Sequence, residues 1–320
     1  MSFRSQGIVT IGFVLFILLL YPLRGALVDD TYIHLVYARN LAEAGELSFN
    51  RGDPTYGATS PLWVGLLAIL YKAGLDLVAA CRMLAILSAL CSIVLVHRLA
   101  RRAGWSSAAA IPALLVLSAD AWFIRWSAVG METSLALLVT LLALDRAFTL
   151  DRPRDSILFG LLLFAAVLAR PESLLLAPVA LAAFLLTRRG WRDYLWIAPF
   201  AILLAVWFLI IEKHTGTYLP LTAGAKQGRP VLSTALFGRA LVPIKVIGAT
   251  LAIPSIAFIA GMVAGCAKGA PLRYFAVDER KRQGTLMLVL WAIGLPAAYV
   301  LFDFQVLSRY LVCRLLLEKK

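Results

Sequence analysis

Residues 156–187 read SILFGLLLFAAVLARPESLLLAPVALAAFLLT, two apolar runs separated by a short polar turn. Both runs are slightly short of the roughly 20 apolar residues with which an α-helix crosses a bilayer. Pro171 cannot continue a helix but fits its first turn, so it should end one helix and begin the next. The stretch therefore predicts a tight helical hairpin embedded in a membrane.

Similar apolar runs recur along most of the chain. The sequence is 61% hydrophobic and has a mean hydropathy of +0.85, too apolar for a soluble protein of 320 residues to cover its own surface. We therefore expect an all-α polytopic membrane protein with about nine spans. The predicted spans are 7–23, 80–97, 108–124, 133–149, 156–170, 172–187, 193–211, 240–266 and 285–302.

The net charge of +13 would suggest nucleic acid as a partner of a soluble protein. Here it has a simpler reading, because Lys and Arg of membrane proteins collect in cytoplasmic loops. The sequence also has no platform of interleaved aromatic and basic residues, so no nucleic acid partner is expected. The four cysteines lie in or beside spans without the spacing of a metal site, which indicates small apolar packing residues.

The run 61–75 is only about fifteen residues long, which is short for a span. If it does not cross and the N-terminus is cytoplasmic, most basic residues of the connecting loops fall on the cytoplasmic side. These residues are Arg4, Arg98, Arg101, Arg102, Arg146, Arg152, Arg154, Arg188, Arg189, Arg192, Lys268, Arg273, Arg280, Lys281 and Arg282. We therefore predict a multi-pass cell-membrane protein in which 61–75 is an interfacial helix on the outer side.

This topology gathers the polar segments on the outer face, in the loops 24–79 and 212–239 and the turn 125–132. Asp29 and Asp30 begin the first loop, just after the first span, where charge is costly and usually functional. They precede a helical pattern that stops at Gly45. Its apolar face is predicted to hold Ile33, Val36, Tyr37, Leu41 and Ala44, with His34 and Arg39 elsewhere on the helix.

Two readings of the carboxylate pair stay open. One aspartate can cap the helix and complement its dipole. Alternatively, one acts as a general base while the other positions it or holds a cation. Asp30 and His34 are four residues apart and share a helical face, which could make half of a metal site.

Three further groups have similar alternatives. Glu132 either complements the dipole of the following helix or is a second acidic group of the site. Arg170, at the end of an apolar helix, either reaches to the interface or clamps a phosphate. Lys226 and Arg229 lie in the Gly- and Thr-rich loop 212–239, where they either hold an anionic head group or are ordinary solvated charges.

Residues 29–70, DDTYIHLVYARNLAEAGELSFNRGDPTYGATSPLWVGLLAIL, resemble the first outer loop of the GT-C superfamily of membrane glycosyltransferases. The resemblance is to the group of mycobacterial β-arabinofuranosyltransferases and their bacterial relatives, the glycosyltransferase 39-like proteins. Further similar pieces follow in the family's order: GMETSL at 130–135, LARPESLLL at 168–176, TYLPLTAGAKQG at 217–228 and RY at 309–310. The similarity extends over roughly residues 7–310, with Leu221 in place of a family asparagine.

The resemblance implies an inverting transferase that moves a hexose or pentose from a polyprenyl-phosphate donor to a glycan, lipid or protein acceptor of the cell envelope. Asp29 or Asp30 would be the catalytic base on the outer, periplasmic side, with Glu132 a second acidic residue. The implied donor-phosphate residues are Lys226, Arg170, Arg309 and Arg39. The implied substrate-pocket residues are His34, Tyr37, Tyr56 and Trp63. A divalent metal, held by Asp30 and His34, fits this chemistry but is not required by it.

On this reading residues 1–310 form one transmembrane domain, and 311–320 form a short C-terminal tail. GT-C relatives usually continue with further spans, so a truncated, inactive homologue is one alternative function. A transporter or flippase of lipid-linked sugars is another. Transporters place polar residues at midmembrane on broken, repeated helices, whereas this sequence shows no internal repeat and puts its polar residues outside the predicted spans.

Overall fold

A computed structural model describes residues 3–105, 107–150, 152–187, 190–218, 220 and 283–292. Regular structure in these residues is helical, apart from an isolated bridge between Ser48 and Pro54. The elements are α1 (Phe3–Leu20), η1 (Tyr21–Leu23), α2 (Asp29–Ala44), α3 (Pro61–Lys72), α4 (Leu77–Arg102), α5 (Ser107–Ala119), α6 (Ala121–Ala128), α7 (Thr133–Ala147), α8 (Pro153–Ala169), η2 (Pro171–Leu175), α9 (Leu176–Leu186), η3 (Trp191–Tyr194) and α10 (Ile197–Thr215). Residues 283–292 form one more helix.

Three segments of the described chain are helical, long and apolar enough to cross a membrane: Gln6–Leu23, Leu77–Arg102 and Trp191–Thr215. The bent pair α6 and α7 makes a fourth if the two helices form one span. Large apolar side chains such as Ile202 and Leu209 on α10 are exposed, as expected for a helix that faces lipid. The predicted helical membrane protein is thus supported, whereas the count of nine spans is not confirmed.

Two features contribute to the difference in span count, together with the shortness of α7, α8 and α9, which have 15, 17 and 11 residues. The predicted span 108–124 is broken at Asp120, whose carboxylate accepts a hydrogen bond of 2.7 Å from the main-chain nitrogen of Phe123 and so caps α6. In addition, the predicted span 240–266 lies outside the described residues, and only part of 285–302 lies within them. The predicted helix break at Pro171 is confirmed, because α8 ends at Ala169 and η2 begins at Pro171.

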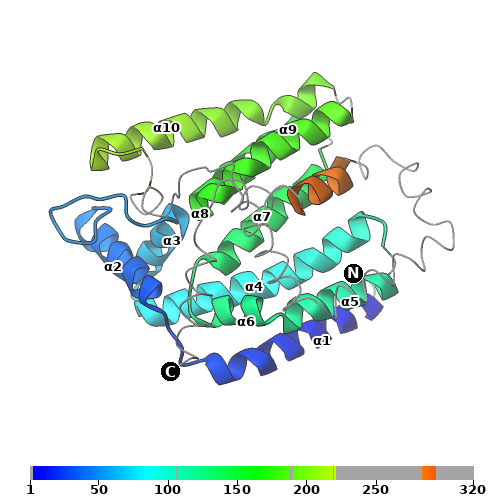
Figure 1. The fold of residues 1–320 in the computed structure, drawn as a ribbon, viewed down its shortest axis with the longest axis horizontal. Helices are drawn as coiled ribbons and strands as arrows, with labels where there is room; N and C mark the ends of the chain where they lie inside the picture. Colours follow the sequence, from blue (N-terminus) through cyan, green and yellow to red (C-terminus); the bar gives the residue numbers. More distant parts are fainter. Residues whose placement is uncertain are drawn as a thin grey trace, which may run out of the picture.

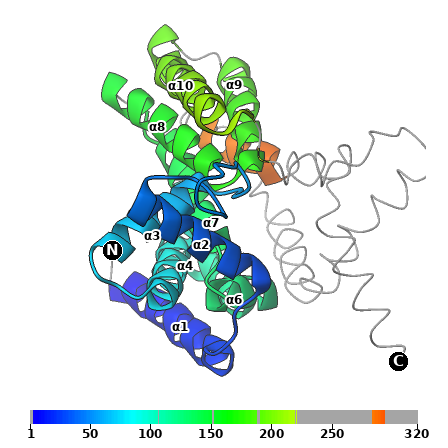
Figure 2. The same ribbon diagram turned by 90° about the vertical axis from the view of Figure 1, so that its left-hand side faces the viewer.

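The long helices run between two ends of the molecule (Figure 1). α4 packs against α7, and α7 packs in turn against α8. α2 and α3 lie together at one end, where α4 begins (Figures 1 and 2). The other end holds the C-terminal end of α4 and the start of α10 (Figure 1). The core between these ends contains the fully buried side chains of Trp63, Leu67, Phe159 and Phe184.

α2 ends where predicted, but it begins at Asp29, two residues before the predicted helical pattern, and its predicted buried face is only partly correct. The helix ends at Gly45, whose φ of 73° places it in the left-handed region that favours glycine. Ile33, however, is 38% exposed, whereas Thr31, His34 and Asn40 are buried. The predicted apolar face is therefore only partly correct: Tyr37 is buried and Leu41 packs against the core, whereas Ile33 is exposed.

The loop from Gly45 to Ser60 is fixed to α2 by hydrogen bonds. Asn40 Nδ2 donates to the carbonyls of Ser48 and Phe49, each at 3.0 Å. The hydroxyls of Tyr37 and Thr55 lie 2.9 Å apart. A Cβ atom at Gly57 would collide with the Tyr37 hydroxyl, so any larger residue there would have to displace that hydroxyl. α2 and the loop therefore form one ordered platform. α3, the predicted interfacial helix, follows it as a short apolar helix.

Candidate functional site

Three segments far apart in the sequence meet at the end of the molecule that holds α2. They are the first turn of α2, the α6–α7 connection and the turn between α8 and η2. Thr31 Oγ1 donates a buried hydrogen bond of 2.8 Å to the carbonyl of Val129. This contact fixes the start of α2 against the α6–α7 connection.

Glu132 lies at the centre of this junction. It is 2% exposed, its Oε1 lies 2.7 Å from Arg170 Nη2, and its Oε2 lies 3.5 Å from His34 Nε2. The same Arg170 nitrogen donates to Thr133 Oγ1 at 3.1 Å. Glu132, Arg170 and His34, here called the buried triad, thereby join α7, α8 and α2.

Opposing effects act on the pKa of Glu132, which lies in the connection outside both neighbouring helices. Burial raises this pKa, but the positive charge of Arg170, followed by that of His34, lowers it by more. The net result is a pKa below the ordinary value for a glutamate. The carboxylate is therefore held in its charged form by its neighbours despite burial.

The local sequence explains how Glu132 reaches this position. Gly130 has a φ of 71°, and a Cβ atom there would lie 2.7 Å from Cys81 Sγ. A glycine is needed for both reasons, and it permits the bend of 116° between α6 and α7. On the other side of the triad, Arg170 is the extended C-cap residue of α8, held there by the following Pro171.

Asp29 and Asp30 occupy the first two positions of α2, and both are exposed. The N-cap residue is Val28, which makes no side-chain cap, so the prediction that one aspartate is the N-cap is wrong. Both carboxylates lie at the positive end of the helix dipole, which favours negative charge there. Within the described part of the chain, neither carboxylate makes a hydrogen bond or an ion pair.

The predicted pocket residues lie close to the platform but differ in exposure. Tyr37 and Tyr56 are nearly buried, and Trp63 is fully buried in the core. The ring of Tyr56 lies 6.3 Å from that of Trp207 on α10, and burial raises the pKa of the Tyr56 hydroxyl. Trp63 therefore serves packing in this structure, and a contact of these residues with substrate stays a prediction.

The predicted phosphate-binding residues are not brought together in the described chain. Arg39 is exposed on α2, whereas Arg170 is only 32% exposed and is paired with Glu132. The Arg170 guanidinium is thus held by Glu132 and Thr133, and its predicted contact with a phosphate stays a prediction. Lys226 and Arg309 lie outside the described residues.

Sequence reasoning singled out each member of the buried triad but missed that the three are partners. The signal was present: Glu132 and Arg170 both flank apolar helices on one predicted face, and buried charges are almost always paired. The exposed Asp30 and the buried His34 face different surroundings in this structure. Among the described residues no group of three or more His, Cys, Asp or Glu side chains could hold a metal ion, so a divalent metal stays a prediction.

Comparisons with known proteins give one structural similarity. No protein-family model matches the chain, and no curated protein matches it. A crystal structure of the oligosaccharyltransferase of Archaeoglobus fulgidus, in complex with Zn and sulfate, is similar at a TM-score of 0.46 and 15% sequence identity. The similarity covers 92% of this chain and 50% of that one, so the chain spans about half the length of the archaeal protein.

Proposed function

We propose that this protein is a membrane glycosyltransferase of the GT-C type that uses a polyprenyl-phosphate-linked sugar as donor. The observation that carries the proposal is the pair of exposed carboxylates at Asp29 and Asp30. Both are unpaired in the described chain, and they begin a helix that is anchored through Thr31 and His34. This pair also begins the sequence stretch that resembles the first outer loop of GT-C enzymes.

The proposed reaction is a single displacement. The acceptor hydroxyl oxygen forms a bond to the anomeric carbon as the bond from that carbon to the phosphate oxygen breaks. The proton of the acceptor goes to Asp29 or Asp30, and the electron pair leaves with the polyprenyl phosphate. Such a transfer needs one base and a stabilised leaving group, and it proceeds without a covalent carboxylate intermediate.

In this proposal Glu132 is a positioning residue. Its carboxylate is already occupied by Arg170 and His34, so it holds the first turn of α2 in place and does not itself take the acceptor proton. The donor phosphate would be bound by Lys226, Arg309 and Arg39, the predicted phosphate-binding residues that do not belong to the buried triad. His34, Tyr37 and Tyr56 remain proposed contributors to the sugar pocket.

The proposed site faces the outer side of a cell membrane. Arginines dominate the opposite end of the molecule, including Arg98, Arg102, Arg146 and Arg152. Basic loops of membrane proteins remain in the cytoplasm. The end with α2 would then meet lipid-linked donors and envelope acceptors on the outer surface.

The proposal is tested with the purified full chain in proteoliposomes. Polyprenyl-phosphate donors carrying a radiolabelled hexose or pentose are supplied with an envelope extract as acceptor. The wild type is compared with Asp29→Asn, Asp30→Asn and the double variant. Asp53→Asn is the matched control, because Asp53 is also an exposed aspartate at this end, in the loop that follows α2.

Removing a general base is expected to lower the transfer rate by a factor of about 10² to 10⁴ in one single variant and in the double variant. The control variant should transfer at the wild-type rate. Normal transfer by the double variant would refute the assignment of the base. Absence of transfer by the wild type with every donor would refute the proposed function itself.

A further inference from the structure

Arg82 is a cation near the candidate site that the sequence alone did not single out. It lies in the second turn of α4, which begins at the end of the molecule that holds α2 (Figure 1). Its Nη2 donates to the carbonyl of Ala26 at 3.5 Å, in the segment that leads into α2. Ala26 precedes Asp29 by three residues, and three residues of extended chain span at most about 10 Å. The Arg82 guanidinium therefore lies close to the exposed carboxylate pair.

A second set of contacts connects Arg82 with the start of α2. The main-chain nitrogen of Arg82 would lie 3.7 Å from a Cβ atom at Gly130, in the α6–α7 connection. The carbonyl of the neighbouring Val129 accepts the hydrogen bond from Thr31 on α2. α4, the α6–α7 connection and α2 thus meet beside Arg82.

The side chain of Arg82 lies on a face of α4 that packs inside the protein. Ile86 and Ala89, one and two turns further along the helix, share this face and pack with residues of α1 and α6. Arg82 itself is partly buried, and its Nε is buried without a hydrogen-bond partner among the described residues. The guanidinium is therefore directed into the helix bundle rather than into lipid.

The positive charge of Arg82 is not compensated by the described part of the chain. Arg102, Arg146 and Arg170 are also partly buried, and each forms an ion pair with a carboxylate. Arg82 forms none with the described residues. Because charged groups are seldom buried without a partner, this position favours an anionic ligand.

The depth of Arg82 indicates what carries the anion. Arg82 is five residues from the start of α4, which is about 8 Å along the helix axis. The polar region on each side of a bilayer is roughly 5–8 Å thick. Arg82 thus lies where the head group of a lipid meets the hydrocarbon, which is the depth of a phosphate attached to a polyprenyl chain.

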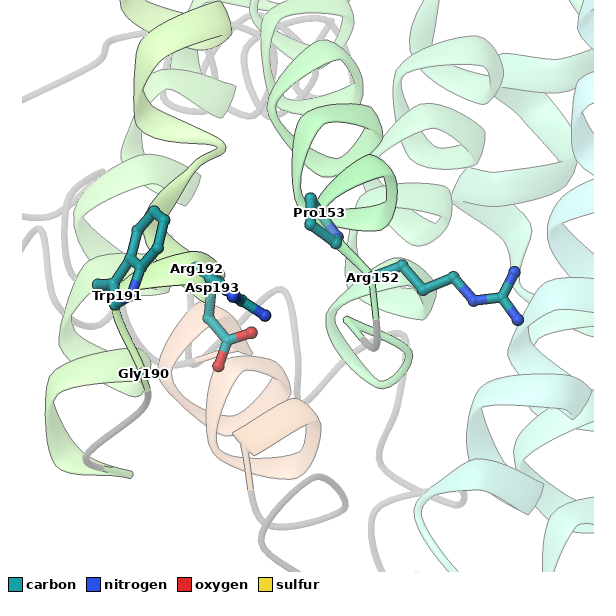
Figure 3. Close-up of a pocket in the computed structure, with 6 residues that line it drawn as sticks. All are labelled: Arg152, Pro153, Gly190, Trp191, Arg192 and Asp193. Atoms are coloured by element: carbon teal, nitrogen blue, oxygen red, sulfur yellow. The ribbon is translucent and has the colours of Figure 1, made fainter.

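A cleft at the other end of the helices offers no equivalent site. It has a volume of about 320 Å³, lies between η3 and the start of α8, and is lined in part by Arg152 and Arg192 (Figure 3). The Arg152 side chain extends away from η3, so the cleft does not bring the two guanidinium groups to one phosphate (Figure 3). It is also remote from the carboxylate pair.

We propose that Arg82 binds the phosphate of the lipid-linked sugar donor, an inference that rests on the proposed function and adds a residue to it. As the bond between the anomeric carbon and the phosphate oxygen breaks, its electron pair stays on that oxygen. Hydrogen bonds from the Arg82 guanidinium stabilise the charge that develops there, and Arg82 keeps all its protons. The contact with Ala26 orients the guanidinium toward the start of α2.

Binding of a polyprenyl monophosphate to the full chain in detergent, measured by native mass spectrometry, tests this proposal. Polyprenol of the same length, which has a hydroxyl in place of the phosphate, is the comparison ligand. Arg82→Gln removes the charge but keeps an amide that can donate to the Ala26 carbonyl. It should weaken binding of the phosphate about tenfold, as expected for the loss of a charged hydrogen bond, and leave polyprenol binding unchanged. Arg82→Lys keeps the charge and should retain most of the affinity.

Arg24→Gln is the matched control. The Arg24 Nη1 also donates to a main-chain carbonyl, that of Tyr21 at 3.4 Å, but Arg24 is exposed and stacked on the ring of the same tyrosine. This variant should bind the polyprenyl phosphate like the wild type. Equal weakening of both ligands in Arg82→Gln would indicate a structural role and overturn the proposal, as would equal binding of both ligands by the wild type. Arg82-dependent binding of inorganic phosphate or phosphatidylglycerol with the same affinity would also overturn it, because the site would then recognise any phosphate.

Sugar transfer, measured in parallel in proteoliposomes, separates this proposal from the proposed function. Transfer by the wild type together with unchanged phosphate binding in Arg82→Gln would refute the role of Arg82 alone. Phosphate binding that requires Arg82, without transfer from any donor, would support the phosphate site and refute the transferase reaction.

Discussion

At the scale of single residues, Glu132 and Arg170 form the interaction that most constrains the candidate site. Removing Arg170 alone would leave Glu132 as a buried carboxylate without its main counter-charge. Breaking a fully buried pair costs about 3–5 kcal/mol, and the partial exposure of Arg170 reduces this to about 2 kcal/mol for Arg170→Leu. Thermal unfolding of the variant in detergent should show a correspondingly lower Tm.

The double variant Arg170→Leu with Glu132→Leu distinguishes the stability that comes from the ion pair from the stability that each side chain contributes by itself. If the loss in Arg170→Leu comes from an orphaned charge, removing Glu132 as well should restore much of the stability. Losses that simply add in the double variant would contradict this account. Glu172→Leu is a suitable comparison, because Glu172 lies 3.8 Å from the same guanidinium but is more exposed than Glu132.

The lowered pKa of Glu132 gives a pH dependence with a definite sign. Because the folded protein holds this group below the ordinary glutamate pKa of 4.5, the unfolded chain binds the proton more readily. The stabilisation is therefore complete above about pH 4.5 and is lost as the pH falls through the folded-state value. The difference in Tm between the wild type and Glu132→Gln should be largest near pH 7 and shrink below pH 4.5. A difference that stayed constant down to pH 3 would exclude a charged Glu132.

The residues of the site could be predicted one by one, but their partners could not. Adjacent carboxylates after an apolar span stand out in the sequence, and the structure places both at the start of α2. The pairing of Glu132 with Arg170 joins residues 38 positions apart. It depends on how α7 and α8 pack, which the local apolar pattern of either helix does not encode.

At the scale of elements, the α6–α7 connection depends on Gly130. Gly130→Ala would place a Cβ atom 2.7 Å from Cys81 Sγ and would also strain a backbone with a positive φ. Gly45→Ala is the matched control, because its φ is 73° and no atom lies within 4 Å of its added Cβ. Both variants should lose the roughly 1–2 kcal/mol of the left-handed conformation, and Gly130→Ala should lose clearly more.

Urea or thermal unfolding in detergent measures both losses. Cys81→Ala removes the sulfur that the new Cβ would meet, so it should relieve the steric part of the loss in unfolding free energy. The double variant Gly130→Ala with Cys81→Ala should therefore lose about as much stability as Gly45→Ala. Equal losses in Gly130→Ala and Gly45→Ala would show that the contact with Cys81 is unimportant.

The elements also show where sequence patterns succeed. The C-terminal end of α2 follows from a glycine stop signal, and the break before η2 follows from Pro171, both of which act locally. The buried face of α2 was only partly predicted, because His34 and Asn40 are buried through partners on other segments. Apolar periodicity carries no information about such partners.

At the scale of the whole molecule, apolar runs predicted a helical membrane protein but not how each run crosses. A run such as 108–124 is long and apolar enough to span. Asp120 nevertheless ends α5 and caps α6, and α6 and α7 then meet at a bend of 116°. Hydropathy measures length and composition, whereas bends arise from caps and glycines whose effect depends on the surrounding helices.

The distribution of charge predicts how the molecule is oriented. Asp53 lies in the loop beside α2, and Arg154 lies at the start of α8 at the arginine-rich end; both are exposed. If the basic end is cytoplasmic, a membrane-impermeant maleimide should label the Asp53→Cys variant on intact cells. The same reagent should label the Arg154→Cys variant only after the membrane is permeabilised. Cys91 is the exposed native cysteine among the described residues, and it lies within the span α4, so Cys91→Ala provides the background. The reverse labelling pattern would place the carboxylate pair in the cytoplasm and rule out an outer-face donor site, while leaving the contacts of the buried triad unaffected.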